Sequence, residues 1–136
     1  KQLSNQLRKM VRKYDVVIRL GGEEFVIICP GADRTGSMAL AGRLLNAINL
    51  YNFGTEQHIV KMKLSIAVSA YPDDKIVNGM DLINCADNVL NKVKESGGNS
   101  VYTTLDLKKT RALSSVKTKK GENVELLEEK IEKLTK

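Results

Sequence analysis

The chain has 136 residues, the usual size of one compact domain, and its 42% apolar and 28% charged residues argue against disorder. No apolar run approaches the roughly 20 residues of a membrane span, and Cys29 and Cys85 lie in apolar runs, which indicates reduced core thiols in a cytoplasmic domain. The net charge of +6 belongs to the two ends, because residues 14–105 carry eight Lys/Arg against ten Asp/Glu, which argues against a nucleic-acid-binding face.

The first predicted elements are a helix and a β-hairpin. Apolar residues recur at helical spacing from Leu3 to Val11 with no capping residue before them, so the chain is expected to open inside an amphipathic helix of a longer protein. The β-rich runs 16–20 and 25–29 flank a Gly-Gly pair, which predicts a tight hairpin because glycine accepts positive φ.

A second helix and a long strand are expected next. Asp33 or Thr35 can cap a helix that extends through Ile48, and residues 51–57 are expected to connect it to the strand. Residues 59–69 alternate apolar and polar side chains, which predicts one long strand with a buried face.

The last elements of the predicted domain are a helix and a short strand. Asp81 can cap a helix whose apolar stripe runs to Val93, residues 97–99 (Gly-Gly-Asn) end it, and residues 101–104 form a strand. This order of elements predicts an α+β fold, with helices covering a mostly antiparallel sheet.

The C-terminal part has a different composition. Residues 105–122 are rich in Lys, Ser and Thr and are expected to be a basic, solvated connector. Four apolar residues then stand at coiled-coil spacing: Val124, Leu127, Ile131 and Leu134. We expect residues 122–136 to be helical and to self-associate, the alternative being a helix docked loosely on its own domain.

The Gly-Gly turn and the two acids after it form the most informative stretch. Gly21 and Gly22 allow a ligand to approach the backbone closely. Glu23 and Glu24 repel each other unless a cation lies between them, and a hard divalent ion beside phosphates is the common reason for such a pair. The local residues leave open the alternative of an ordinary acidic surface turn.

Three segments together resemble the GGDEF family of diguanylate cyclases. Residues 19–25, Arg-Leu-Gly-Gly-Glu-Glu-Phe, are similar to the family's signature hairpin. Residues 63–69 resemble its Ser-Ile-Gly strand, and residues 86–99 resemble its closing Ala-Asp helix and Gly-Arg-Asn turn. The segments occur in the family's order and spacing over residues 1–104.

This resemblance implies a nucleotidyl-cyclase or palm-like βααββαβ fold and the condensation of two GTP to cyclic di-GMP with release of pyrophosphate. Glu23 and Glu24 are implied as catalytic ligands of Mg²⁺ or Mn²⁺, and Gly21 and Gly22 as the nucleotide-binding backbone. Lys94 is implied to reach the terminal phosphates, although taken alone it is an ordinary solvated lysine at a helix end. Two domains are implied to face each other as a homodimer.

A second constellation precedes the hairpin. Arg12 and Asp15 resemble the family's inhibitory Arg-x-x-Asp motif, and Arg43 matches the further arginine of that product-binding site. Arginine forks suit phosphates and guanine edges, and a carboxylate can accept from the guanine N–H groups. The alternative is a plain ion pair between Arg12 and Asp15 at the end of the helix.

The sequence also departs from the family pattern. Gly98 stands where the family usually has arginine, and the family's first strand and helix, with an aspartate that shares the metal, are not in this chain. We therefore expect residues 1–104 to be a GGDEF domain without those elements, followed by residues 105–136, and expect this chain alone to be inactive. The alternative function is a non-catalytic receptor of GTP or cyclic di-GMP, or a dimerising relay attached to other signalling domains.

Overall fold

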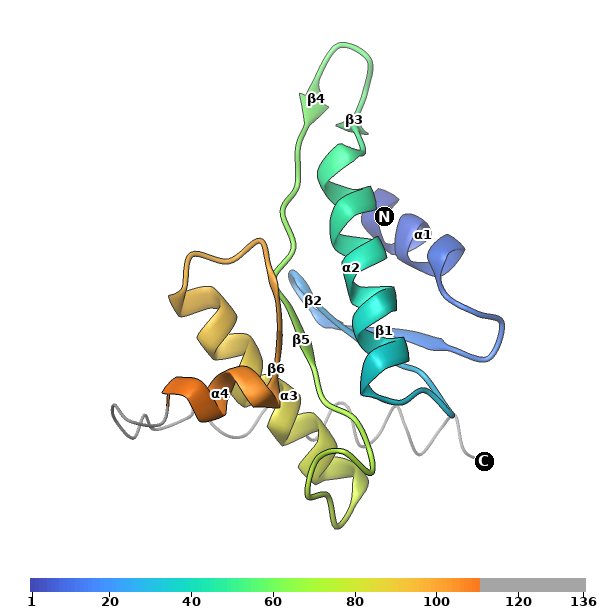
Figure 1. Cartoon of the computed structure of the whole chain (residues 1–136). Helices are drawn as coiled ribbons and strands as arrows, with labels where there is room; N and C mark the ends of the chain where they lie inside the picture. The colour runs from blue at the N-terminus through green and yellow to red at the C-terminus, as the bar shows by residue number, and fades with distance from the viewer. Residues whose placement is uncertain (111–136) are drawn as a thin grey trace.

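The computed structural model describes residues 1–110, and the helix and self-association expected for residues 122–136 lie outside this range. The described chain mixes helices and strands, as the α+β expectation requires (Figure 1). The elements are α1 (Gln2–Met10), β1 (Val16–Gly21), β2 (Glu24–Ile28), α2 (Arg34–Leu50), β3 (Phe53–Gly54), β4 (Ile59–Val60), β5 (Ile66–Val68), α3 (Gly79–Glu95), β6 (Val101–Thr103) and α4 (Thr104–Thr110).

The strands form three separate pairs. β1 and β2 form the antiparallel hairpin predicted around the Gly-Gly turn, with Val16 opposite Ile28. β3 and β4 are also antiparallel, whereas β5 and β6 run parallel. They are parallel because α3 lies between them in the sequence and returns the chain to the same end. The single, mostly antiparallel sheet that we expected is therefore not formed by residues 1–110.

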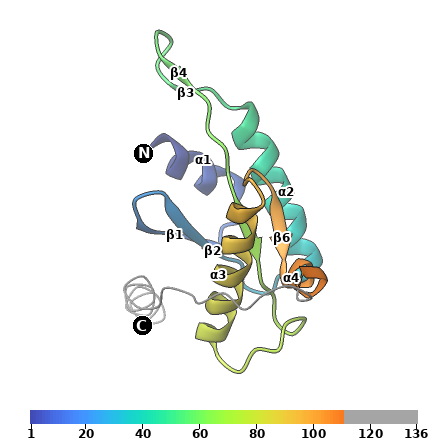
Figure 2. The same cartoon turned by 90° about the vertical axis from the view of Figure 1, so that its left-hand side faces the viewer.

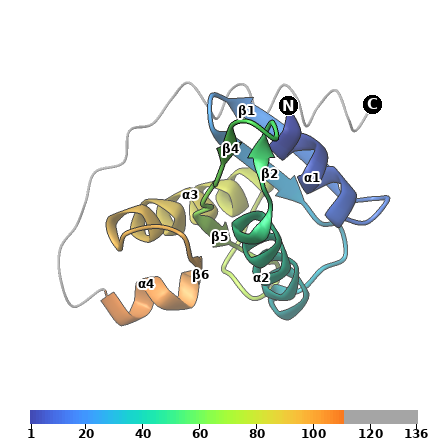
Figure 3. The same cartoon turned by 90° about the horizontal axis from the view of Figure 1, so that it is seen from above.

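Helices α2 and α3 pack against the β5–β6 pair. Both helices contact both strands, which lie between them in the view of Figure 2. α3 and α4 contact each other and lie on the side away from α1 (Figure 3). The most deeply buried side chains come from these helices: Ile48 of α2 and Val89 and Val93 of α3. Val89 and Val93 belong to the apolar stripe predicted for the second of these helices, so this part of the stripe faces the core as expected.

No helix within residues 1–110 has the length and apolarity needed to cross a membrane.

The prediction of one long strand over residues 59–69 is wrong. Only β4 and β5 are strands, and residues 61–65 between them belong to no ladder of the described chain. Part of the connector expected at residues 51–57 instead forms β3, and the β3–β4 hairpin projects beyond the end of α2 (Figures 1 and 2). Alternation of side chains indicates which face of a strand is buried, but a strand also needs a neighbour with which to pair.

The N-terminal cap predicted for α2 is confirmed, whereas the cap predicted for α3 is wrong. Asp33 caps α2, and its carboxylate accepts a hydrogen bond from the backbone N–H of Gly36 at 2.7 Å. The cap of α3 is Asn78 rather than Asp81. Asp81 is the third helical residue and accepts from the backbone N–H of Asn78 at 3.2 Å, completing a capping box. An acid near a helix start indicates the first turn but does not distinguish these two positions.

A buried carboxylate joins three parts of the chain. Asp74 is only 7% exposed, and it accepts hydrogen bonds from Arg34 Nη2 at 2.6 Å and from the backbone N–H of Ala70 at 2.8 Å. The hydroxyl of Thr104 also donates to it. Thr104 begins α4, so the connector expected from residue 105 starts as a helix tied to the body of the domain.

We predict that Asp74→Asn destabilises the protein by about 3 kcal/mol, because the partly buried guanidinium of Arg34 loses its buried charged partner. Urea unfolding of the chain measures this change. The control is Glu95→Gln, which breaks the exposed pair between Lys92 and Glu95 and should cost no more than about 0.5 kcal/mol. Equal costs for the two substitutions would show that Asp74 makes only a surface-like contact.

Candidate functional site

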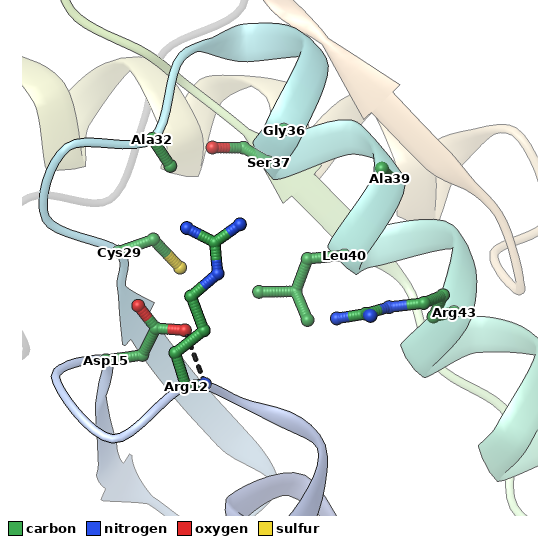
Figure 4. Close-up of a pocket in the computed structure, with 9 residues that line it drawn as sticks. All are labelled: Arg12, Asp15, Cys29, Ala32, Gly36, Ser37, Ala39, Leu40 and Arg43. Carbon is green, nitrogen blue, oxygen red and sulfur yellow. Dashed lines mark hydrogen bonds between the residues drawn. The ribbon is translucent and has the colours of Figure 1, made fainter.

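A hollow of about 160 Å³ lies between the α1–β1 turn, the end of β2 and the first turns of α2 (Figure 4). Arg12 and Asp15 line it from the turn, and Arg43 lines it from α2. The hollow is smaller than the roughly 300–1,000 Å³ of sites that enclose a drug-sized ligand, so it can hold only part of a nucleotide. The structure therefore brings together the three residues that the sequence proposed for a product site.

The α1–β1 turn sets the direction of the Arg12 side chain. The backbone N–H of Arg12 donates to Asp15 Oδ2 at 2.8 Å, and the backbone N–H of Asp15 donates to the Arg12 carbonyl at 3.1 Å. The Asp15 carboxylate thus binds the backbone of Arg12, while the guanidinium extends into the hollow (Figure 4). Within residues 1–110, the simple ion pair between the two side chains that we considered as an alternative is not formed.

The face of α2 toward the hollow follows helical spacing. Gly36, Leu40 and Arg43 stand at positions i, i+4 and i+7, so one side of the helix carries all three. The guanidinium of Arg43 points toward the hollow (Figure 4), and it has no carboxylate partner among the described residues. Two arginines that form no ion pair with any residue of 1–110 therefore face one space, which is an arrangement suited to an anion.

Sequence reasoning did not assign Cys29 to this site. We expected a core thiol, but Cys29 is half-buried and lines the hollow at the end of β2. Burial raises the pKa of the Cys29 thiol, the nearby Asp15 carboxylate raises it further, and Arg12 lowers it in part. The thiol therefore stays protonated at neutral pH. The one feature of the sequence that could have placed Cys29 in the hollow is its position directly after the strand that leads toward α2.

The hairpin turn is fixed by an arginine of its own first strand. Arg19 donates to the carbonyl of Gly22 from Nη2 at 2.6 Å and from Nε at 3.2 Å, and its guanidinium lies 5.8 Å from the ring centroid of Phe25. Gly22 has a φ of +44°, which a residue with a side chain rarely adopts. Arg19 is thus a positioning residue for the turn, a role that the motif alone did not indicate.

The two acids of the hairpin differ in their surroundings. Glu23 is exposed at the tip, whereas Glu24 is half-buried at the start of β2 and pairs with Lys94 near the end of α3, at 3.3 Å between Oε1 and Nζ. The structure thus brings Lys94 to the hairpin, although 70 residues separate it from Glu24.

The hairpin carboxylates fit a hard cation that has other ligands as well. Residues 1–110 contain no cluster of three or more His, Cys, Asp or Glu residues that could hold a metal ion. Glu23 and Glu24 supply two carboxylates, and Mg²⁺ commonly binds through one or two carboxylates together with water and substrate phosphates. The donors present therefore suit Mg²⁺ or Mn²⁺ bound with a phosphate ligand.

The turn after α3 explains how Gly98 fits where the family usually has arginine. Gly98 has a φ of +69°, and its backbone N–H donates to the Val93 carbonyl at 2.9 Å to close the helix. A Cβ atom at this position would lie 2.8 Å from Ser65 Oγ. Glycine therefore suits both the backbone conformation and the close approach of Ser65.

Comparison with known proteins identifies the family. Residues 1–100 match the model of the diguanylate cyclase GGDEF domain, and the chain belongs to this family. It is 28% identical over 102 residues to the probable diguanylate cyclase DgcT of Escherichia coli. It is 30% identical over 98 residues to MucR of Pseudomonas aeruginosa, a bifunctional diguanylate cyclase/cyclic di-GMP phosphodiesterase, and 25% identical over 100 residues to diguanylate cyclase A of Treponema denticola.

These alignments cover 74%, 72% and 74% of this chain but only 23%, 14% and 27% of the three relatives. The chain therefore spans about a quarter or less of the length of these proteins.

We predict that Gly98→Ala destabilises the protein by about 1–2 kcal/mol, from the positive φ and from the contact with Ser65 Oγ. The same substitution in a Ser65→Ala background should cost at least about 0.5 kcal/mol less, because the hydroxyl is then absent. Urea unfolding of the two single variants and the double variant completes the cycle. An identical cost in both backgrounds would remove Ser65 from the explanation.

Proposed function

We propose that the chain is part of a diguanylate cyclase, in which the β1–β2 hairpin and Lys94 bind GTP with Mg²⁺ or Mn²⁺. Family membership supports the activity, and the proximity of Glu24 to Lys94 supports a site where a cation and a phosphate meet. The bound cation would neutralise charge that develops on the phosphates. Two GTP molecules would condense to cyclic di-GMP.

The proposed chemistry is two phosphoryl transfers. In each, the 3′-oxygen of one GTP forms a bond to the α-phosphorus of the other, the bond between the α-phosphorus and the bridging oxygen breaks, and pyrophosphate leaves. Glu23 favours loss of the proton from the attacking hydroxyl, and Lys94 holds the departing phosphates as a point charge. Gly21 and Gly22 let the backbone lie against the nucleotide. Alignment of the two substrates requires two such domains, so we propose a homodimer.

We also propose that the hollow between α1, β2 and α2 binds the product, cyclic di-GMP, and that this binding inhibits the cyclase. The observation that carries this proposal is the pair of guanidinium groups, Arg12 and Arg43, which face one hollow without carboxylate partners among residues 1–110. Such forks suit phosphodiesters, and the Asp15 carboxylate can accept from a guanine edge.

The family resemblance supports three finer proposals. They are a palm-like βααββαβ sheet in the whole domain, a cytoplasmic location, and attachment to other signalling domains. A second function, that of a non-catalytic receptor for cyclic di-GMP, is favoured by one observation. Gly98 offers no side chain where the family usually has an arginine, yet the hollow keeps both of its arginines.

We predict that the chain binds cyclic di-GMP with a Kd in the low micromolar range, about −8 kcal/mol. Arg12→Ala should weaken binding by about 1.5–3 kcal/mol, the scale of a charge-assisted hydrogen bond. Titration calorimetry measures both affinities. Arg8→Ala is the matched control, because Arg8 is exposed on α1 and does not line the hollow.

Cysteine alkylation provides a second readout of the same prediction. Bound ligand should slow the modification of Cys29, which lines the hollow, and leave that of Cys85 on α3 unchanged. Equal affinity of the wild type and Arg12→Ala, with no protection of Cys29, would contradict a product site here.

We predict that Glu23→Gln lowers cyclic di-GMP synthesis by the protein that contains this chain at least about 100-fold, because a carboxylate at the reacting centre loses its charge. Chromatography of the products formed from GTP measures the rate. The control is Glu56→Gln, an exposed acid between β3 and β4, which should retain the parental rate. Unchanged synthesis by Glu23→Gln would overturn the assignment of Glu23.

A further inference from the structure

The ion pair between Glu24 and Lys94 joins two side chains that, in the proposed function, bind ligands of opposite charge. Glu24 is proposed to bind a cation, and Lys94 is proposed to bind phosphate. In the structure the two side chains instead bind each other, at 3.3 Å between Oε1 and Nζ. Each group therefore occupies the position that the other's ligand would take.

The electrostatic consequence is a coupling between the two ligands. An ammonium beside Glu24 reduces the negative potential at the hairpin and so opposes a divalent cation that arrives alone. A phosphate that draws Lys94 away removes this opposition, and a cation on the hairpin likewise releases Lys94 for phosphate. Because coupling between two binding equilibria is reciprocal, each ligand raises the affinity for the other.

Two neighbouring charged residues, Lys92 and Glu23, do not oppose this exchange. Lys92, two residues before Lys94 on α3, is held by Glu95 at 2.8 Å and so has a local partner. Glu23 forms no ion pair within residues 1–110 and adds its negative charge at the tip. The paired side chains of Lys94 and Glu24 are 53% and 41% exposed, so they can separate without opening the core.

We propose that Lys94 is an internal counter-ion of Glu24, which makes cation binding at the hairpin depend on phosphate binding. The hairpin then favours a nucleoside triphosphate together with its divalent cation over the free cation. This inference rests on the proposed function of the hairpin and adds a role for Lys94 in the ligand-free protein. Lys94 is a positioning residue in that state, and a phosphate ligand in the bound state.

The test measures binding of Mn²⁺ alone to the chain by electron paramagnetic resonance. Lys94→Met removes the counter-ion and should tighten Mn²⁺ binding about two- to five-fold, the equivalent of an exposed ion pair. Lys92→Met is the control on the same helix and should bind as the wild type does. The double variant Glu24→Gln/Lys94→Met should lose the gain. Unchanged Mn²⁺ affinity in Lys94→Met, or no Mn²⁺ binding by any of the proteins, would overturn the proposal.

Binding of GTP in the presence of Mn²⁺ separates this proposal from the proposed function. Lys94→Met should weaken GTP binding while it strengthens binding of Mn²⁺ alone, and a purely structural role of the pair would not produce opposite signs. If the wild type binds no GTP but Lys94→Met still gains Mn²⁺ affinity, the nucleotide function fails and the counter-ion role stands. If GTP binds and Mn²⁺ affinity does not change, only the counter-ion role fails.

Discussion

The buried carboxylate of Asp74 fixes the starts of α2 and α4 relative to the segment that follows β5. It lies after β5 and binds the side chain of Arg34 at the start of α2 and of Thr104 at the start of α4. The adjacent Asp73 accepts from the backbone N–H of Arg34 at 3.0 Å, so the first residue of α2 is fixed at both backbone and side chain. A buried carboxylate of this kind is tolerated because both of its oxygens accept hydrogen bonds and Arg34 supplies the opposite charge.

The candidate product site depends on the same fixation. The hollow needs Arg43 to face Arg12, and Arg43 is carried by α2, whose orientation follows from its anchored first turn. The hairpin has a separate support, since Arg19 shapes its turn and Lys94 of α3 reaches Glu24. The two regions thus share the scaffold of α2, α3 and the β5–β6 pair, but different contacts set their geometry.

Local pattern predicted the hairpin and the helices, and the family resemblance predicted that Arg12 and Arg43 would meet. Long-range partners were harder to predict. Residues 59–69 have the alternation of a strand, yet pairing depends on a neighbour that the alternation does not reveal. Glu24 and Lys94 are 70 residues apart in the sequence. Only the folded chain shows that these two side chains, to which separate roles were assigned from the sequence, form an ion pair with each other. Cys29 looked like core because an apolar run does not show where a pocket opens.

The segment 61–65 between β4 and β5 has a consequence for how copies of this protein behave together. It lies outside the ladders of the described chain, and backbone N–H and C=O groups that are not paired in a ladder can pair with another molecule. Lys61 and Lys63 are both exposed along it, and Lys61 also donates to the Leu50 carbonyl at 3.0 Å. Two molecules that approached through this segment would bring four ammonium groups together, and this repulsion opposes pairing of the two backbones.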